Sequence, residues 1–510
     1  MRYLLFLFFF AAGFTVSLPA QKGYKPPVFE DPDRMEKIQA VIPEIERQYL
    51  ELMERQHIPG LAYGIVVDGK LVYSKGLGVI NRESKEAVTA ASLFRIASMT
   101  KSFTAMAILK LREEGKLQLS DPVTKHLPQL AGLKTLTTDA PPPTIHHLLT
   151  MTAGFPEDNP WGDQQLEDTD QEFLEFLKGG ISFSTVPSSG YEYSNLGYAM
   201  LGRIVTQVSG MPYQKYIDQQ IFKPLGMTHT HWEYEGLPAN LLALGYRWED
   251  DQWKPEPMLH DGAYGAMGGL ITSIEDFGKY LALHLAAWPA RDGAEAGPVK
   301  RSSVREMHRM VEPRLAANAR DDDGAPCPTV AAYGYGLRIQ KNCQGLTLIG
   351  HSGGLPGFGS NHTFAPDYGV GIVSFANRTY APAAAANELA MRTLIRQANL
   401  KPRSLPPSDI LIKRQQQVAR LIQTWDEALG AEILAENFYL DRSRNHRKTE
   451  AEALLASAGT ILSIEPIQPE NQLRGTFILK GIQKDIAVFF TLSPEKDPKV
   501  QALSLRLVAN

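Results

Sequence analysis

Strand-like segments stand at both ends of a long helix-rich stretch, and this arrangement constrains the fold more than any other feature of the sequence. Two β-rich runs flank Asp68-Gly69 in LAYGIVVDGKLVYSKGLGVI, a pattern typical of a hairpin with a two-residue turn. Further strand signals come much later, in residues 332–340, 345–350, 360–366 and 369–376. Because strands need partners for their backbone groups, both ends should share one sheet. The sequence therefore predicts an α/β domain whose sheet combines distant parts of the chain.

Apolar residues at helical spacing predict the helices between and around these strands. The first helix is expected over residues 34–57, with Pro43 inside it, and another from Ser98 to Glu114, ending at Gly115. Further helices are expected at 170–178, 196–209, 211–221, 273–287, 301–311 and 381–399.

Two proline-rich segments divide the chain and are interpreted as linkers, residues 21–33 and 401–408. Residues 34–400 between them are expected to form the main domain. Residues 409–510 are expected to form a separate small α+β domain without a catalytic constellation. Its predicted helices cover 409–430 and 449–457, and its predicted strands lie near 460–466, 473–480, 484–492 and 500–507.

The first 20 residues resemble a secretory signal peptide. Arg2 precedes an apolar run from Leu4 to Ala12, which is too short to span a membrane comfortably, and Ala20 is a plausible cleavage point. We therefore expect a periplasmic or secreted protein with no stable membrane span after cleavage. The net charge of −4 and the lack of a basic stripe argue against nucleic acid as a partner.

The chain has two cysteines, Cys327 and Cys343. In an exported protein such a pair is a candidate disulfide, and two unpaired thiols fit the sequence equally well. Neither cysteine belongs to a pattern typical of a nucleophile or a metal ligand.

A serine and a lysine three residues apart, Ser98 and Lys101 in FRIASMTKSFTAM, form the first candidate for chemistry. On a helix they share one face, and a neutral, buried lysine could take the proton of a serine nucleophile. The alternative is a solvated helix. Average composition alone predicts one or two serine–lysine pairs at this spacing in a chain of this length. A second pair indeed occurs in Ser493-Pro494-Glu495-Lys496, in a predicted exposed turn.

The second candidate is Tyr193-Ser194-Asn195, at the start of a predicted helix. The Tyr193 hydroxyl could relay a proton if cations such as Lys101 lie beside it. The Asn195 amide could hold a substrate carbonyl. The alternative is that Asn195 only caps the helix.

The third candidate, GHSGG at residues 350–354, has two interpretations. It matches the nucleophile elbow of α/β-hydrolases, but an elbow requires a following helix, and here another β-rich run follows. The preferred interpretation is an edge strand whose glycines let a substrate approach. There, His351 would point into a cleft near Tyr193, and the N–H groups of Gly354 and Ser98 would bind an oxyanion. His146-His147 and His229-x-His231 lack the spacing of a metal site, and no cofactor is expected.

In this order, the three elements resemble the serine β-lactamase and penicillin-binding-protein superfamily. The Tyr-x-Asn is similar to that of class C β-lactamases and their DD-peptidase and esterase relatives. The resemblance covers roughly residues 35–400 and extends to GKLQLSDPVTKHLP, IHHLLTMTAGFP, IFKPLGMTHT and GAYGAMGGLITSIEDFGKYL. It implies an antiparallel sheet flanked by helices, together with a helical region.

The resemblance also implies roles for individual residues. Ser98 would be the acylated nucleophile, Lys101 and Tyr193 would share acid and base duties, and Asn195 would contact the substrate or Lys101. The other substrate-binding residues would be His351, Ser352, Gly353 and Gly354. Class C β-lactamases carry Lys-Thr-Gly where this chain has His351-Ser352-Gly353, and a neutral imidazole attracts a substrate carboxylate less than lysine does.

The sequence therefore predicts a serine hydrolase that acts through an acyl-enzyme on an ester, amide or peptide bond of a small molecule or peptide. A D-amino-acid peptidase, carboxypeptidase or esterase is favoured, with weak or no β-lactamase activity. The alternative is a catalytically inactive relative that binds cell-wall peptides or a protein partner. The C-terminal domain is expected to shape the cleft or to pair chains, so a homo-oligomer is a further expectation.

Overall fold

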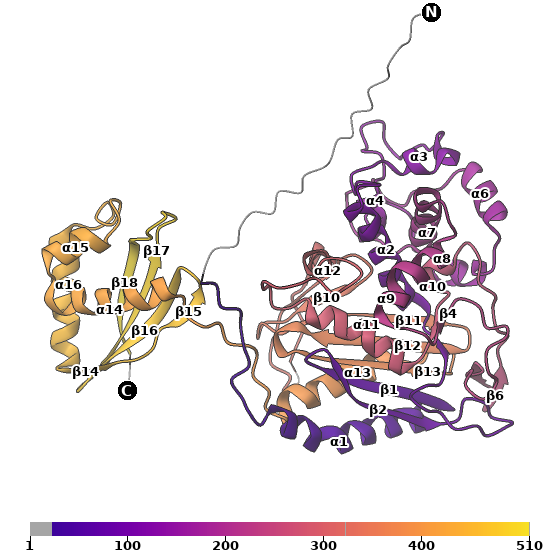
Figure 1. Ribbon diagram of the computed structural model, residues 1–510, viewed down its shortest axis with the longest axis horizontal. Coiled ribbons are helices and arrows are strands. Elements are labelled where there is room, and N and C mark those ends of the chain that lie inside the picture. The colour runs from indigo at the N-terminus through magenta and orange to yellow at the C-terminus, as the bar shows by residue number, and fades with distance from the viewer. Residues whose placement is uncertain (1–22, 322, 509–510) are drawn as a thin grey trace, which may run out of the picture. The chain divides into compact units, whose positions relative to one another are not determined.

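The computed structural model describes residues 23–321 and 323–508, so the predicted signal peptide at residues 1–20 lies outside the described part of the chain (Figure 1). The described chain forms two compact units. The larger is Phe29–Arg403, and the smaller contains residues 404–508 together with residues 23–28. Within the described residues, none of the helices combines the length and apolar character needed to span a membrane.

An eight-stranded antiparallel sheet forms the centre of the larger unit, in the order β2-β1-β13-β12-β11-β10-β9-β8. Its strands are β1 (Gly60–Val67), β2 (Lys70–Gly78), β8 (Val311–Ala316), β9 (Thr329–Tyr333), β10 (Arg338–Lys341), β11 (Thr347–Leu355), β12 (Phe358–Ala365) and β13 (Val370–Ala376). Asp68 and Gly69 both have positive φ, at 49° and 78°, as a tight hairpin turn requires. Because β1 pairs with β13, the prediction of a sheet that joins distant parts of the chain is confirmed.

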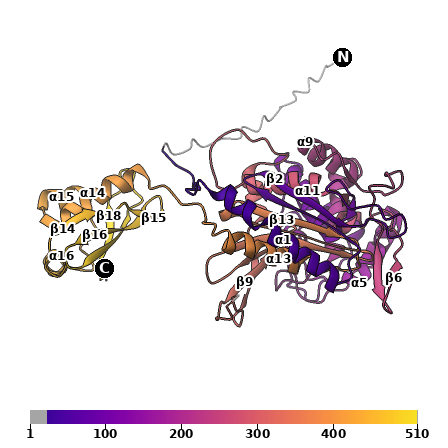
Figure 2. The same cartoon turned by 90° about the horizontal axis from the view of Figure 1, so that it is seen from below.

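Helices cover both faces of this sheet. On one face, α1 (Arg34–Arg55) packs beside α13 (Ala383–Arg392), as Figure 2 shows. The buried stripe of α1 includes Ile38, Ile45 and Tyr49, at the spacing of one helical face, and the helix continues through Pro43. On the other face, α11 (Ile274–Ala286) packs on β1, β2 and β13.

The helical region beyond α11 is built around α2 (Lys101–Glu113) and α7 (Asn195–Ser209), which contact each other. The remaining elements of the larger unit are α3 (Val123–His126), α4 (Ile145–Thr150), α5 (Asn159–Gly162), α6 (Asp170–Lys178), α8 (Tyr213–Ile217), α9 (Lys223–Leu225), α10 (Gly265–Gly268), α12 (Arg301–Met307), β3 (Phe94–Arg95), β4 (Thr230–His231), β5 (Tyr246–Glu249), β6 (Gln252–Pro255) and β7 (Ile271–Thr272). A fold of a large antiparallel sheet flanked by helices, with a helical region, is therefore confirmed.

Two sequence predictions in this unit need correction. Residues 332–340 do not form one strand, because a turn separates β9 from β10. At that turn Gly336 has φ 71°, and an added Cβ would lie 2.7 Å from the Cα of Ser102, so a side chain does not fit against α2. The helix expected at 301–311 ends at Met307, and Val311 already begins β8.

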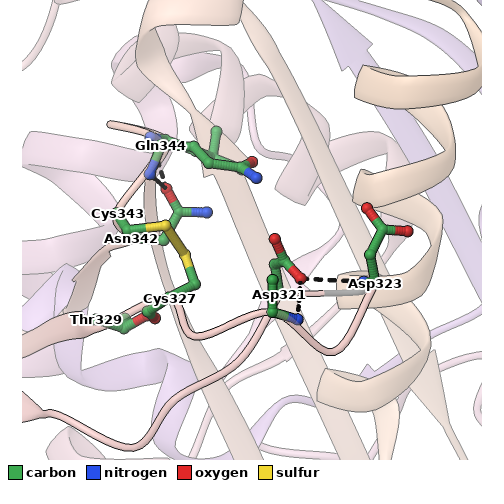
Figure 3. Close-up of a disulfide and its surroundings, with 9 residues drawn as sticks. Asp321, Asp323, Cys327, Thr329, Asn342, Cys343 and Gln344 are labelled. Atoms are coloured by element: carbon green, nitrogen blue, oxygen red, sulfur yellow. Dashed lines mark hydrogen bonds between the residues drawn. A yellow bond between two sulfur atoms is a disulfide. The ribbon is translucent and has the colours of Figure 1, made fainter.

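A disulfide joins Cys327 and Cys343, which answers the question that the sequence left open (Figure 3). It connects the segment before β9 to the turn between β10 and β11. A cross-link over a loop of 16 residues stabilises a fold by about 3 kcal/mol. The disulfide thus stabilises the end of the sheet that contains β10, β9 and β8.

The smaller unit packs three helices, α14 (Asp409–Thr424), α15 (Glu427–Ile433) and α16 (Arg444–Ala458), with a five-stranded antiparallel sheet. The strands are β14 (Ile461–Ile464), β15 (Gln468–Asn471), β16 (Arg474–Gly481), β17 (Asp485–Leu492) and β18 (Val500–Val508). The helix expected over 409–430 is broken at Trp425, whose φ of 47° ends α14. Phe438, Phe477 and Phe490 lie in the core of this unit.

Candidate active site

Ser98 lies in a short 3₁₀ turn, Ala97–Thr100, and Lys101 is the first residue of α2. Ala97, directly before Ser98, has φ 48°, a conformation that costs energy for a residue with a side chain. Ser98 is 8% exposed and Lys101 is fully buried. The solvated-helix interpretation of this motif is therefore wrong.

The amine of Lys101 has three oxygen neighbours. Its Nζ lies 2.8 Å from Ser98 Oγ, 2.7 Å from Asn195 Oδ1 and 2.8 Å from the carbonyl oxygen of Met267. The amide and the carbonyl oxygen can only accept hydrogen bonds, whereas the serine hydroxyl can also donate. A neutral amine has two N–H groups and one lone pair, so it can donate to both acceptors and accept a hydrogen bond from the hydroxyl of Ser98.

Burial lowers the pKa of Lys101 to about 7, because the charged form loses its hydration. The carboxylates of Asp163 and Asp158 oppose this effect, and Arg338 adds to it. Near neutral pH a large fraction of Lys101 is thus uncharged, the state that a general base requires.

Tyr193 lies just before α7 and its hydroxyl faces Ser98, while Asn195 is the first residue of α7 and contacts Lys101. Ser194 caps α7 by accepting a hydrogen bond from the N–H of Gly197, so the interpretation of Asn195 as the cap is wrong. Asn195 instead accepts from Lys101 and donates from Nδ2 to Asn159 Oδ1 (3.1 Å). Burial raises the pKa of Tyr193 strongly, while Ser98 and Arg338 lower it. The phenol is therefore protonated at neutral pH.

The third motif lies on β11, which is an inner strand of the sheet and not the edge strand expected from the sequence. Its pairing with β10 covers only residues 347–350, so residues 351–355 are paired on one side alone, with β12. Because β11 continues to Leu355 and turns into β12, no nucleophile elbow is formed at Ser352. The Oγ of Ser352 accepts a hydrogen bond from Asn361 Nδ2 at 3.0 Å.

The free side of β11 lies against the turn that carries Ser98. A Cβ on Gly353 would lie 2.0 Å from the carbonyl oxygen of Ile96, so only glycine fits at this approach. A Cβ on Gly354 would meet the ring of Tyr380 at 2.5 Å. Gly353 thus lets the backbone of β11 lie against the turn that carries Ser98, and Gly354 leaves room for the ring of Tyr380.

His351 points towards Tyr193, with the ring centroids 6.1 Å apart. Its Nδ1 lies 2.6 Å from the carbonyl oxygen of Ser352, an acceptor, so Nδ1 carries the proton and Nε2 accepts from Tyr333 Oη at 2.9 Å. Burial places the pKa of His351 well below its usual value, and Arg338 and Lys101 lower it further. The imidazole is neutral.

A cleft of about 510 Å³ opens over Ser98. Of the residues predicted from the sequence, Ser98, Tyr193, His351, Ser352, Gly353 and Gly354 line it, while Lys101 and Asn195 lie beneath Ser98. The cleft also contains residues that sequence reasoning missed, namely Asn159, Asp163, Arg338 and Tyr380. They come from three separate segments and belong to no motif, so no local signal could have assigned them to the site. Among the described residues, no group of histidine, cysteine or acidic side chains is arranged to hold a metal ion.

A family model described as Beta-lactamase matches residues 45–395. "Protein flp" of Staphylococcus aureus (strain COL) is 30% identical over 342 residues, which cover 65% of this chain and 62% of that protein. The match thus spans less than two thirds of that relative. A "Beta-lactamase" of Pseudomonas fluorescens is 26% identical over 344 residues, covering 64% of this chain and 91% of that protein.

Solved structures share the fold. The octameric penicillin-binding protein homologue from Pyrococcus abyssi superposes with a TM-score of 0.59 at 24% identity, over 90% of this chain and 93% of that one. The D-alanine carboxypeptidase AmpC from Burkholderia cenocepacia has a TM-score of 0.55 at 21% identity, over 70% of this chain and 99% of that one.

Proposed function

Since the chain belongs to the beta-lactamase family of serine hydrolases, we propose that it cleaves an ester, amide or peptide bond through an acyl-enzyme at Ser98. The observation that carries this proposal is the contact between Ser98 Oγ and Lys101 Nζ, 2.8 Å apart, around an amine whose pKa is about 7. A nucleophile on the wall of the cleft is thereby held in contact with a fully buried base.

In the proposed acylation step, the lone pair of Lys101 Nζ takes the proton of Ser98 as Oγ attacks the substrate carbonyl carbon. The N–H groups of Ser98 and Gly354 stabilise the negative oxygen that forms. The Lys101 ammonium then returns its proton to the leaving amine or alcohol, with the Tyr193 phenol as the relay. The carbon–leaving-group bond breaks, and an ester on Ser98 remains.

Deacylation reverses these roles with water as the nucleophile. Lys101 takes a proton from the water, directly or through the Tyr193 phenol as a relay, as the water oxygen attacks the ester, and a proton returns from Lys101 to Ser98 Oγ when the acid product leaves. This step regenerates the free enzyme. Atoms and electrons balance in both steps without a metal ion or a redox partner.

Arg338 supports a substrate that carries a carboxylate. Its guanidinium lies 5.4 Å above the ring centroid of Tyr193 and has no ion-pair partner within residues 23–321 and 323–508. Although His351 is neutral, β10 therefore brings a cation into the same cleft. We propose a peptidase or esterase of small peptides or acyl compounds, with weak or no β-lactamase activity.

The proposal is tested by the mass of the purified protein after brief exposure to a p-nitrophenyl ester, a penicillin and a D-alanyl peptide ester. We expect an added mass equal to the acyl group with at least one donor, located by peptide mapping on the segment that contains Ser98. An adduct on another segment would refute the assignment. No adduct and no turnover with any donor would favour the inactive, peptide-binding relative.

Arg338→Gln is expected to raise KM for a short peptide with a free carboxylate by about 10- to 100-fold, because a charge-assisted contact is lost. The same peptide with a C-terminal amide should show little change in KM. Steady-state kinetics with both peptides measures the difference. An equal effect on both would mean that Arg338 acts through Tyr193 and not on the substrate.

A periplasmic or secreted location and a homo-oligomer are part of the same proposal. The signal-like segment at residues 1–20 supports export. The fold shared with an octameric homologue over 90% of this chain supports assembly, with the C-terminal unit as the candidate for the contact.

A further inference from the structure

Two charged residues of opposite sign line the cleft. Among the described residues that line it, Asp163 provides the one carboxylate and Arg338 the one guanidinium. Arg338 has a role in the proposed function as the group that meets a substrate carboxylate. Asp163 has none, and it is 4% exposed.

The segment that carries Asp163 is fixed against the start of α7. The carboxylate of Asp158 accepts hydrogen bonds from the backbone N–H groups of Asn195 (2.6 Å) and Leu196 (2.8 Å). Gly162 packs on Asn195 so closely that an added Cβ would lie 2.8 Å from the Cβ of Asn195. Asp163 is thus held at a defined place beside the Lys101–Asn195 pair.

Tyr380 holds one side of the Asp163 carboxylate. The Tyr380 hydroxyl donates to Oδ2 at 2.9 Å, and its ring lies against Gly354. The other oxygen, Oδ1, has no hydrogen-bond partner in the part of the chain that the structure describes. One oxygen of this largely buried carboxylate therefore opens to the cleft, where a ligand can reach it.

A buried carboxylate with one hydrogen bond is costly unless a cation or donor completes it. Burial raises the pKa of Asp163 to about 6, and the positive charge of Lys101 opposes this shift. Near neutral pH, Lys101 is partly uncharged and already bound to three oxygens, so it compensates this charge incompletely. A protonated amine on a ligand would supply both the missing charge and the missing donor.

We propose that Asp163, held by Tyr380, forms a subsite for a protonated amine of the substrate, so that the preferred substrates are aminoacyl compounds and short peptides with a free ammonium group. This inference rests on the proposed function and narrows its substrate class. With Arg338 it gives the cleft one site for each charge of a zwitterionic peptide.

The test compares alanine p-nitroanilide, as both enantiomers, with its N-acetyl counterpart. The wild type should prefer the free amine of one enantiomer, and Asp163→Asn should lower that preference about 10- to 100-fold, mainly through KM, because a charged hydrogen bond is lost. The ratio of kcat/KM for the two substrates is measured within one protein sample. A variant that folds only in part therefore lowers both values equally and leaves the ratio unchanged.

Asp168→Asn is the matched control, since it removes the same charge from the same segment without changing the cleft lining. It should keep the wild-type preference. A competing role for Asp163 is to raise the pKa of Lys101. In that case Asp163→Asn would shift the pH profile equally for the free and the acetylated substrate, and the inference would be overturned.

Failure of this inference can be told apart from failure of the proposed function. If a p-nitrophenyl ester still acylates Ser98 but the wild type shows no preference for the free amine, only the ammonium subsite is refuted. If Ser98 is acylated by no donor, the proposed function fails and the subsite with it.

Discussion

Replacing Lys101 by methionine is expected to lower kcat/KM by about 10³- to 10⁴-fold, because Ser98 loses the base that takes its proton. Methionine has a similar length and suits the apolar surroundings, so the packing of α2 should persist. Methionine leaves Asn195 Oδ1 and the Met267 carbonyl oxygen without the donor that Lys101 supplies, so a modest fall in Tm is expected beside the loss of activity. Steady-state kinetics with a p-nitrophenyl ester and thermal unfolding measure the two effects.

The chain provides a matched control for this substitution. Lys496 stands in the second S-x-x-K match, where Ser493 Oγ donates to Glu495 and Lys496 is exposed. Lys496→Met should leave kcat/KM unchanged. A loss of less than tenfold in Lys101→Met would refute Lys101 as the base, and in Ser98→Ala the acyl adduct should disappear altogether.

The pH dependence of kcat/KM is a second test of Lys101 as the base. Because the pKa of Lys101 is about 7, the neutral base forms as the pH rises through 7. We therefore expect the acid limb of kcat/KM to have its midpoint near pH 7 and to be absent from the residual activity of Lys101→Met.

A cluster of three buried histidines is expected to make the protein sensitive to acid. His284, His308 and His362 surround the ring of Phe364, at centroid distances of 5.6, 5.2 and 6.4 Å. Both ring nitrogens of His362 lack hydrogen-bond partners among the described residues. Nothing near this imidazole can therefore accept the second N–H that protonation would add.

His284 and His308 are also arranged as neutral rings. Trp288 donates from Nε1 to His308 Nδ1 at 2.9 Å, so the proton of His308 is on Nε2 and points to His284 Nδ1 at 2.8 Å. Protonating His308 at Nδ1 would place two N–H groups face to face. Burial accordingly lowers the pKa of His284 and of His362 to about 3, and that of His308 well below its usual value.

The direction of the effect follows from linkage. Each folded-state pKa lies below the value of about 6.5 for an unfolded histidine, so stability is complete above pH 6.5 and is lost as the pH falls towards 3. Each histidine contributes about 1.4 kcal/mol of this loss per pH unit. The three histidines together therefore lower the free energy of unfolding strongly as the pH falls below 6.5. The raised pKa values of Asp163 and Asp261 have the opposite effect, since these carboxyl groups favour the folded state as the pH falls.

His362→Leu is expected to remove one of these contributions. Between pH 7 and pH 5, the variant should lose about 2 kcal/mol less free energy of unfolding than the wild type does. Urea unfolding at both pH values measures this difference. The control is His229→Leu, which replaces an exposed histidine of the same unit. Between pH 7 and pH 5 it should lose as much free energy of unfolding as the wild type does. Equal losses in all three proteins would contradict the prediction.

Local features of the sequence were sufficient for much of the fold. The Asp68-Gly69 turn and the stripe of α1 depend on residues that are neighbours in the chain, and both elements were predicted within a few residues. The strand at 332–340 was predicted wrongly because its residues favour strand throughout, whereas the close approach of Gly336 to Ser102 imposes a turn. Contacts with distant segments decided that case.

The sequence by itself determined which groups could react, because the spacing of Ser98 and Lys101 on one helical turn is a local property. The local sequence context also set Ser493 and Lys496 apart as an exposed turn, whereas only the tertiary structure decided the chemical state of Lys101. Asn195 and Met267, which are 94 and 166 residues away from Lys101, bury its amine and accept its hydrogen bonds. The pKa of a lysine depends on the desolvation and charges around it, and these come from chain segments that only folding brings together.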